Sequence, residues 1–209
     1  FLALLGWSWD EKTTIFSVAD LIAKFNLKKV SKAGAVFDLN KLNWLNGYWL
    51  RQMPLDELTK KLIPFWQKAG FLPAEVPAEK FNWLKQLAAV CQERIFKLSD
   101  IISLTDFFFA EVKYDEQAVK QVFLPQADLV LTKAAEVLKQ TLPFTEENIE
   151  KNLRELAATL GLKPKKVFQL IRVAVSGRTV SPPLFTTLAL LGQEKCLTRL
   201  TKAKTLWGL

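Results

Sequence analysis

Proline and glycine divide this chain into segments whose apolar residues recur at helical spacing. This division limits the possible folds more than any other feature of the sequence. Proline is favoured in the first turn of a helix and glycine just after its last turn. Apolar residues repeated every three or four positions give such a segment one buried face. Helices are therefore predicted over about 54–70, 77–98, 145–161, 164–177 and 193–204, with others beginning at 125 and ending at 192. The predicted fold class is all-α.

The short connections between these segments predict how the helices assemble. Helices joined by short turns form bundles. An irregular stretch containing Phe107 to Phe109 separates the first helices from the later ones, so we expect two stacked helical subdomains that meet between about 110 and 125. In the last helix, Leu197 and Leu200 are expected to face the core, and Lys195, Arg199 and Lys202 to face solvent.

Neighbouring carboxylates occur four times, at 10–11, 56–57, 115–116 and 146–147. A glycosidase would need two carboxylates facing each other across a cleft, whereas neighbours on a helix point about 100° apart. Negative charge stabilises the first turn of a helix. We therefore interpret these pairs as helix starts, with Thr145 as the N-cap before Glu146 and Glu147.

Positive charge gathers toward the carboxyl end. Residues 151–209 contain 11 Lys and Arg against two Glu, whereas the first 150 residues contain 18 basic and 19 acidic side chains. Such asymmetry is expected of a surface that binds a polyanion, because each phosphate neutralised by Lys or Arg releases a counterion. Lys163, Lys165 and Lys166 are the candidates for anchoring phosphates. Charge alone leaves open a basic surface that is merely solvated or that docks a protein.

The sequence lacks the residues of the commonest catalytic and metal sites. It contains no His, which excludes Ser-His-Asp and Cys-His catalysis and removes the commonest metal ligand. No glycine-rich loop of the kinds that cradle nucleotide phosphates occurs. Cys91 and Cys196 stand alone in apolar helical sequence and are interpreted as small core residues. We predict no catalytic residue, no metal site and no cofactor in this chain.

The longest apolar runs, Phe1 to Leu5 and Phe107 to Ala110, are far shorter than the roughly 20 residues that span a bilayer. We therefore expect no membrane partner and, with two reduced cysteines, a cytoplasmic setting. Phe1 begins an apolar run without an initiator Met or a basic leader, which we interpret as a cut through a longer protein.

The segment 167–184, VFQLIRVAVSGRTVSPPL, combines residue types that read unpaired RNA bases. It places an Arg on a helix, follows it with a glycine stop and ends in a stiff Ser-Pro-Pro-Leu loop. Single-stranded bases are recognised when they splay against a preformed surface that offers Arg and polar groups to their edges and apolar groups to their faces. The candidate residues are Arg172, Arg178, Ser181, Pro182 and Leu184. An ordinary helix connection is the alternative.

Three blocks of the sequence resemble the C-terminal half of bacterial-type glutamyl-tRNA synthetases, which are class I enzymes. They are FLALLGWS at 1–8, VSKAGAVFDLNKLNWLNGYWLR at 30–51 and IRVAVSGRTVSPPLFTTLALLGQEKCLTRL at 171–200. The resemblance implies three regions: the end of a stem-contact region at 1–50 and two helical anticodon-binding subdomains at 51–120 and 121–209.

The same resemblance implies roles for individual residues. Arg172, Ser181, Pro182 and Leu184 match positions that line the pocket for the first two anticodon bases. Arg94, in QERIFKLSD, matches a position at which an Arg reads the third base and favours the glutamate anticodon over the glutamine one. Lys97 departs from the family pattern, in which Thr is usual. The sequence leaves open whether the glutamine isoacceptor is bound as well.

The function expected from the resemblance is tRNA anticodon binding within a glutamate–tRNA ligase, which charges tRNA with glutamate using ATP. The two catalytic motifs of that family are absent, so ATP and Mg²⁺ are expected to bind a catalytic domain that this chain lacks. The chain is expected to be monomeric and to bind RNA without catalysing. The alternative is a basic helical scaffold for protein interactions.

Overall fold

The structure, a computed structural model, describes residues 1–10 and 12–208. These residues form eleven α-helices and two short 3-10 helices and contain no strand, so the all-α prediction is confirmed. Glu11 lies outside the described residues, and with it the interpretation of the carboxylate pair at 10–11.

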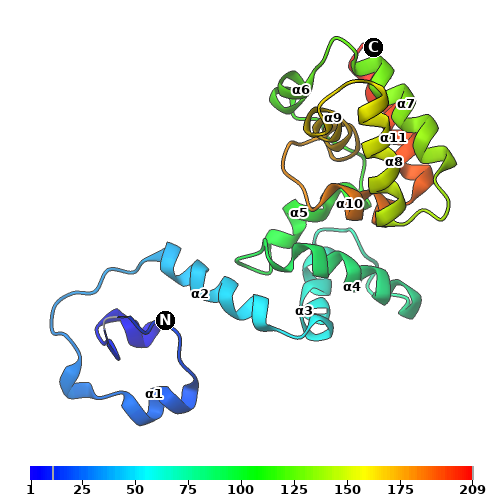
Figure 1. Cartoon of the computed structure of the whole chain (residues 1–209). Helices are drawn as coiled ribbons and strands as arrows, with labels where there is room; N and C mark the ends of the chain where they lie inside the picture. The colour runs from blue at the N-terminus through cyan, green and yellow to red at the C-terminus, as the bar shows by residue number, and fades with distance from the viewer. Residues whose placement is uncertain (11, 209) are drawn as a thin grey trace.

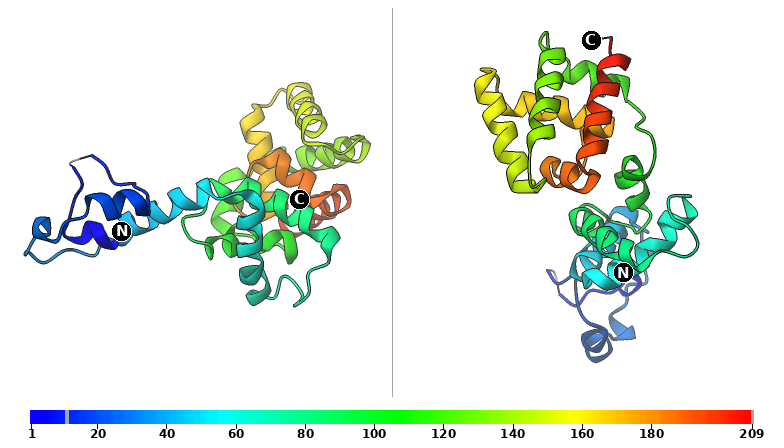
Figure 2. Two further views of the ribbon diagram at one scale, coloured as in Figure 1. Left: turned by 90° about the horizontal axis from the view of Figure 1, so that it is seen from below. Right: turned by 90° about the vertical axis from the view of Figure 1, so that its right-hand side faces the viewer.

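The molecule is elongated, and its chain passes through three parts in order (Figure 1). The N-terminal part contains η1 (Leu2–Leu5), α1 (Val18–Lys24) and η2 (Leu27–Lys29). The helix α2 (Leu39–Gln52) leads from it to a middle part made of α3 (Leu55–Lys68), α4 (Ala78–Gln92) and α5 (Asp100–Phe109). In the right-hand view of Figure 2 the N-terminal part lies below these middle helices and the remaining helices lie above them.

The third part holds the last six helices. They are α6 (Glu116–Val122), α7 (Ala127–Gln140), α8 (Glu146–Thr159), α9 (Pro164–Ser176), α10 (Leu184–Leu191) and α11 (Gln193–Leu206). The helix α11 packs along α7 and against α9, and α8 packs against α7 and α10. The prediction of two stacked helical units is therefore met by the middle and third parts.

Several predicted helix ends are confirmed. The helix α8 starts after Thr145, whose side chain accepts a hydrogen bond from the Asn148 backbone N–H, and both Glu146 and Glu147 lie in its first turn. The helix α9 starts at Pro164 and ends at Ser176, and Gly177 follows it as the C-cap in a left-handed conformation. The carboxylate pairs at 56–57 and 115–116 also lie at helix starts. These signals are local, so the sequence alone is sufficient to find them.

Two segments differ from the prediction. The helix α4 ends at Gln92 and does not continue to 98, because the Asp100 carboxylate accepts hydrogen bonds from the Phe96 and Lys97 backbone N–H groups and holds that stretch as a loop. The chain around Phe107 is not irregular but forms the end of α5. Both Phe107 and Phe108 are buried there, so apolar burial rather than punctuation stabilises this helix.

Two tryptophans tie the middle part together and to the third part. Trp66 is fully buried, and its indole N–H donates to the Thr105 hydroxyl, 2.9 Å away. Trp83 on α4 donates to the Leu190 carbonyl of α10 at 2.9 Å, where α4 and α10 pack together. This contact fixes one side of the junction between the two helical units.

The boundary between the units bears on the predicted limits 51–120 and 121–209. Residue 120 falls inside α6, and α6 packs against α9 of the third part. The Asp115 backbone N–H also donates to the Gly177 carbonyl at 2.9 Å. We therefore propose that the second unit begins after α5, before α6.

Both cysteines are buried in the core, as predicted. Burial raises the pKa of Cys91 and of Cys196 to about 12, so both thiols stay protonated and unreactive near neutral pH. Over residues 1–10 and 12–208, no helix is long and apolar enough to cross a membrane.

Candidate functional site

The loop that follows α9 brings the central candidate, Arg172, against the Ser-Pro-Pro sequence. Gly177 adopts φ +77° and turns the chain back along the helix. The Ser176 hydroxyl donates to the Arg172 carbonyl at 2.7 Å, which closes the last turn. One nitrogen of Arg172, Nη1, then donates to the Ser181 hydroxyl at 2.5 Å and to the Pro182 carbonyl at 2.8 Å. The guanidinium and the loop therefore hold each other in place.

A second arginine approaches Arg172 from the other helical unit. Arg94 follows α4 and is exposed to solvent. Burial lowers the pKa of Arg172, and the positive charge of Arg94 lowers it further. The second effect means that the two guanidinium groups lie within electrostatic reach although 78 positions separate them in the sequence. Neither forms an ion pair with a carboxylate in the described part of the chain.

Three residues predicted to contact bases lie below the surface of this structure. Ser181, Pro182 and Leu184 are buried, with Ser181 only 5% and Leu184 only 4% exposed. Their contact with bases stays a prediction. The Ser181 hydroxyl and the Pro182 carbonyl instead accept hydrogen bonds from Arg172. Of the loop residues, Pro183 is the one that reaches the surface beside them.

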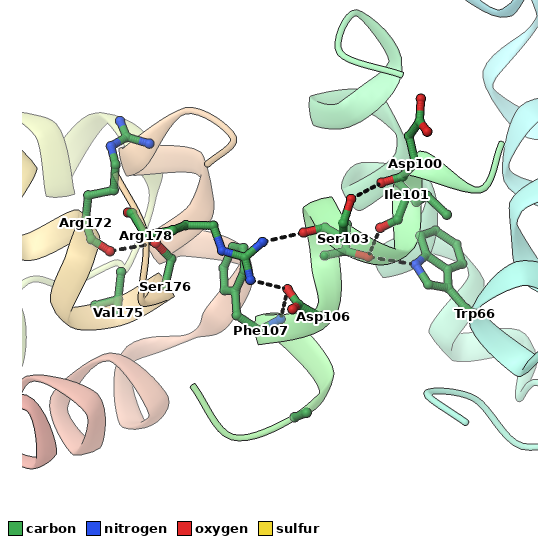
Figure 3. Close-up of polar contacts among 12 residues, drawn as sticks. Trp66, Asp100, Ile101, Ser103, Asp106, Phe107, Arg172, Val175, Ser176 and Arg178 are labelled. Carbon is green, nitrogen blue, oxygen red and sulfur yellow. Dashed lines mark hydrogen bonds and ion pairs between the residues drawn. The ribbon is translucent and has the colours of Figure 1, made fainter. Parts of the chain in front are cut away.

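The side chain of Arg178 makes its hydrogen bonds with α5 and not with the Ser-Pro-Pro loop. Figure 3 shows its side chain reaching across to α5, where it donates to the Ser103 carbonyl and pairs with the Asp106 carboxylate at 2.6 Å. Its guanidinium also lies 5.4 Å from the centre of the Phe107 ring. The Asp106 carboxylate and the Ser103 carbonyl bind Arg178 in this structure, so it links the two helical units, and its role as an RNA contact stays a prediction.

The three candidate phosphate anchors lie together at the start of α9. Lys163 is its N-cap, Lys165 and Lys166 are in its first turn, and all three are exposed. None makes an ion pair among the described residues. Positive charge at a helix N-terminus is opposed by the helix dipole, so these lysines do not stabilise α9. Their placement puts three exposed cations on one surface.

Residues 57–204 match the family described as the anticodon binding domain. The chain belongs to this family. It is 38% identical over 205 residues to the glutamate–tRNA ligase of Desulforamulus reducens and 36% identical over 205 residues to that of Moorella thermoacetica. Each match covers 97% of this chain and 42% of the relative's length. The chain therefore spans less than half of the relatives that it matches.

A solved structure shows the same fold. The crystal structure of a glutamate tRNA ligase from Elizabethkingia meningosepticum, in complex with its amino acid, matches 97% of this chain and 39% of its own, with a TM-score of 0.83 and 28% identity. The sequence-based assignment to the anticodon-binding region of a glutamate–tRNA ligase is thus confirmed.

Arg199 makes a contact that the helical pattern does not predict. The pattern places Arg199 on the solvent face of α11, yet its side chain is half-buried and donates to the Val175 carbonyl at 2.7 Å and to the Phe107 carbonyl. Lys195 and Lys202 are exposed, as predicted, and their amino groups reach the Phe108 carbonyl and the Glu111 carboxylate. Every residue has a main-chain carbonyl, whatever its type. The sequence therefore contains no signal for the contacts of Arg199.

The described residues contain no group of three or more His, Cys, Asp or Glu that could hold a metal ion. What the site offers chemically is positive charge and hydrogen-bond donors. Two arginines from different units and three exposed lysines can pair with the phosphates and base edges of a nucleic acid.

Proposed function

We propose that this chain binds the anticodon arm of tRNA as part of a glutamate–tRNA ligase. The observation that carries the proposal is the geometry of Arg172, whose guanidinium is held by hydrogen bonds to the Ser-Pro-Pro loop while no carboxylate pairs with it in the described chain. A fixed guanidinium without a counterion favours an anionic or electron-rich ligand, because hydrogen bonds from a charged donor are the stronger ones. The membership of the anticodon-binding family supports RNA as that ligand.

Arg172 has the geometry to read a base edge. Only Nη1 makes hydrogen bonds to the loop within the described residues, which leaves Nη2 and Nε as donors. A guanidinium with two free donors can bind a base edge or a phosphate in a fork. Ser181 and Pro182 then act by fixing the direction of Arg172, and not by touching the base themselves.

Arg94 is proposed to read the third anticodon base, as the resemblance to glutamyl-tRNA synthetases implies. It is exposed and lies at the end of α4, so its guanidinium is free to meet a splayed base. We propose the glutamate isoacceptor as the tRNA. Whether the glutamine isoacceptor also binds depends on how strictly Arg94 discriminates at this base.

The proposal extends to cofactors, phosphate contacts, partners and cellular setting. In a whole glutamate–tRNA ligase, ATP and Mg²⁺ serve the charging reaction in a catalytic domain; this chain is proposed to bind RNA and not to catalyse. Lys163, Lys165 and Lys166 are proposed to anchor phosphates beside Arg172. We further propose that the protein acts as a monomer in the cytoplasm with no membrane partner.

Titration with RNA stem-loops tests the function. We expect the chain to bind an anticodon stem-loop of glutamate tRNA more than about ten-fold more tightly than a stem-loop of the same length whose three anticodon bases are replaced. Both loops carry the same number of phosphates, so the difference measures reading of bases. Fluorescence anisotropy at one salt concentration gives both dissociation constants. Equal affinity for the two loops, and for a duplex of equal charge, would instead indicate a general polyanion surface or a scaffold.

The salt dependence of the same titration tests the lysines. Each phosphate neutralised on a single strand contributes about 0.7 to the slope of log affinity against log salt. The combined Lys163→Gln, Lys165→Gln and Lys166→Gln variant is therefore expected to lower that slope by about 2. Lys133 and Lys139 on α7 provide a control pair of exposed lysines outside the site, whose change to Gln is expected to leave the slope nearly as it was. A triple variant with the original slope would remove these lysines from the interface.

A further inference from the structure

Arg199 joins the two helices on which the site depends. Its Nη1 donates to the Val175 carbonyl of α9 at 2.7 Å, while its Nη2 donates to the Phe107 carbonyl and, at 3.4 Å, to the Ala110 carbonyl at the end of α5. One planar group therefore holds the carboxyl-terminal turns of two helices that belong to different units. Lys could not replace it, because a single ammonium lacks the fork that reaches both sides.

The contacts of Arg199 are main-chain contacts, and they lie in a half-buried place. Arg199 is half-buried, and this burial lowers its pKa. The carbonyls at a helix C-terminus lack partners within the helix and carry partial negative charge. Arg199 satisfies these groups for α5. Its removal would leave carbonyls of Phe107 and Val175 without this donor and would loosen the junction on the side facing α9.

Each helix that Arg199 contacts is connected to one of the two arginines proposed to contact bases, α9 to Arg172 and α5 to Arg94. On α9, Val175 lies three positions after Arg172, within the same turn of the helix. On the other side, α5 begins at Asp100, whose carboxylate binds the Phe96 and Lys97 backbone N–H groups of the loop that carries Arg94. Arg199 therefore lies on a continuous path of helices and hydrogen bonds between Arg94 and Arg172.

We propose that Arg199 is a positioning residue that fixes the separation between Arg94 and Arg172. The part of this inference that concerns RNA rests on the proposed function. If the separation is fixed, an anticodon whose first two bases lie at Arg172 presents its third base to Arg94 at one distance only. Arg199, which contacts no base, then sets how strictly the third base is discriminated.

The distance half of the proposal can be tested without RNA. Spin labels are attached at Lys97→Cys, three positions after Arg94, and at Lys165→Cys on α9. Double electron–electron resonance then measures the distance between the two labels. The buried Cys91 and Cys196 are fully protonated near pH 7 and stay unlabelled. We expect Arg199→Gln to shift or broaden the distance distribution.

Lys204→Gln is the matched control. Lys204 lies on the same helix and has the same charge, but it pairs with Asp128 at 2.7 Å and with the Thr132 hydroxyl, both on α7 of its own unit. This variant is expected to keep the distribution of the unsubstituted chain. An unchanged distribution in Arg199→Gln would overturn the proposal, whatever the RNA measurements show.

The specificity half is tested by a ratio of affinities. Two stem-loops that differ only at the third anticodon base are titrated against each variant. A loss of folded protein lowers the active concentration but leaves the ratio of the two dissociation constants unchanged. We expect Arg199→Gln to reduce this ratio about ten-fold, and Lys204→Gln to keep it. A shifted distance with an unaltered ratio would refute the link to specificity.

A different experimental result is expected if the proposed function itself is wrong. In that case the unsubstituted chain itself would bind the original and the base-replaced stem-loops equally. The distance measurement would still decide whether Arg199 sets the separation of the two arginines, so the two failures are distinguishable.

Discussion

Gly177→Ala is expected to destabilise the chain by about 2 to 5 kcal/mol, from backbone strain and overpacking together. Gly177 has φ +77°, a conformation that costs a residue with a Cβ atom. A Cβ atom added there would lie 2.1 Å from the Lys113 carbonyl oxygen. That carbonyl cannot move away easily, because the Asp115 backbone N–H two residues later donates to the Gly177 carbonyl. Urea unfolding followed by circular dichroism measures the loss.

Gly161→Ala separates the two contributions. Gly161 also follows a helix and has a positive φ of +65°, but a Cβ atom added there would meet no other group within 4 Å. Only the strain is expected there, about 1 to 2 kcal/mol. Equal losses at Gly161 and Gly177 would show that the chain at Lys113 gives way and that the close approach of the two segments is not required.

The tight turn at Gly177 lies between two arginines with different roles. The turn separates Arg172, which belongs to the proposed reading site, from Arg178, which is bound to α5. A wider turn would move both the Ser-Pro-Pro loop and the link between the units. The stability of this one turn therefore bears on the site and on the junction at the same time.

The helices that the sequence predicts best are those marked by local signals. Thr145, Pro164 and Gly177 act within one turn of their own position, so their effect needs no knowledge of the rest of the fold. The end of α4 escapes sequence-based prediction because it depends on Asp100, eight positions beyond Gln92. The helix α5 is not predicted because no proline or glycine marks its boundaries near its three phenylalanines.

The contacts of the candidate site also differ in how well the sequence predicts them, according to the separation of the partners along the chain. The pairing of Arg172 with the Ser-Pro-Pro loop lies within a dozen residues and can be predicted as a unit. The approach of Arg94 can be inferred only through resemblance, since nothing in local spacing relates it to Arg172. The contacts that Arg178 and Arg199 make inside the molecule escape sequence-based prediction because their partners lie 24 to 92 positions away and include main-chain carbonyls. Surface charge in the sequence does not show which cations are already used inside the molecule.

Arg172→Ala is expected to weaken binding of the anticodon stem-loop by about 1 to 3 kcal/mol, the range for one well-placed Arg on a base edge. The substitution removes the free Nη2 and Nε donors. It also leaves the Ser181 hydroxyl and the Pro182 carbonyl without the donor that orders them. Both changes act at the proposed reading site, and titration by fluorescence anisotropy measures their sum.

Arg154→Ala gives the comparison that isolates the site. Arg154 lies in the same unit on α8, carries the same charge, pairs with Glu150 at 2.5 Å and lies over the Phe168 and Phe185 rings. Its loss changes net charge equally and removes no hydrogen bond to the Ser-Pro-Pro loop. Its variant is expected to lose less than about 0.5 kcal/mol, as exposed pairs and distant charges do. If Arg172→Ala binds the stem-loop as tightly as Arg154→Ala does, Arg172 takes no part in recognition. If only Arg172→Ala weakens binding, and more for the original anticodon than for the replaced one, then the guanidinium reads bases and does more than attract phosphates.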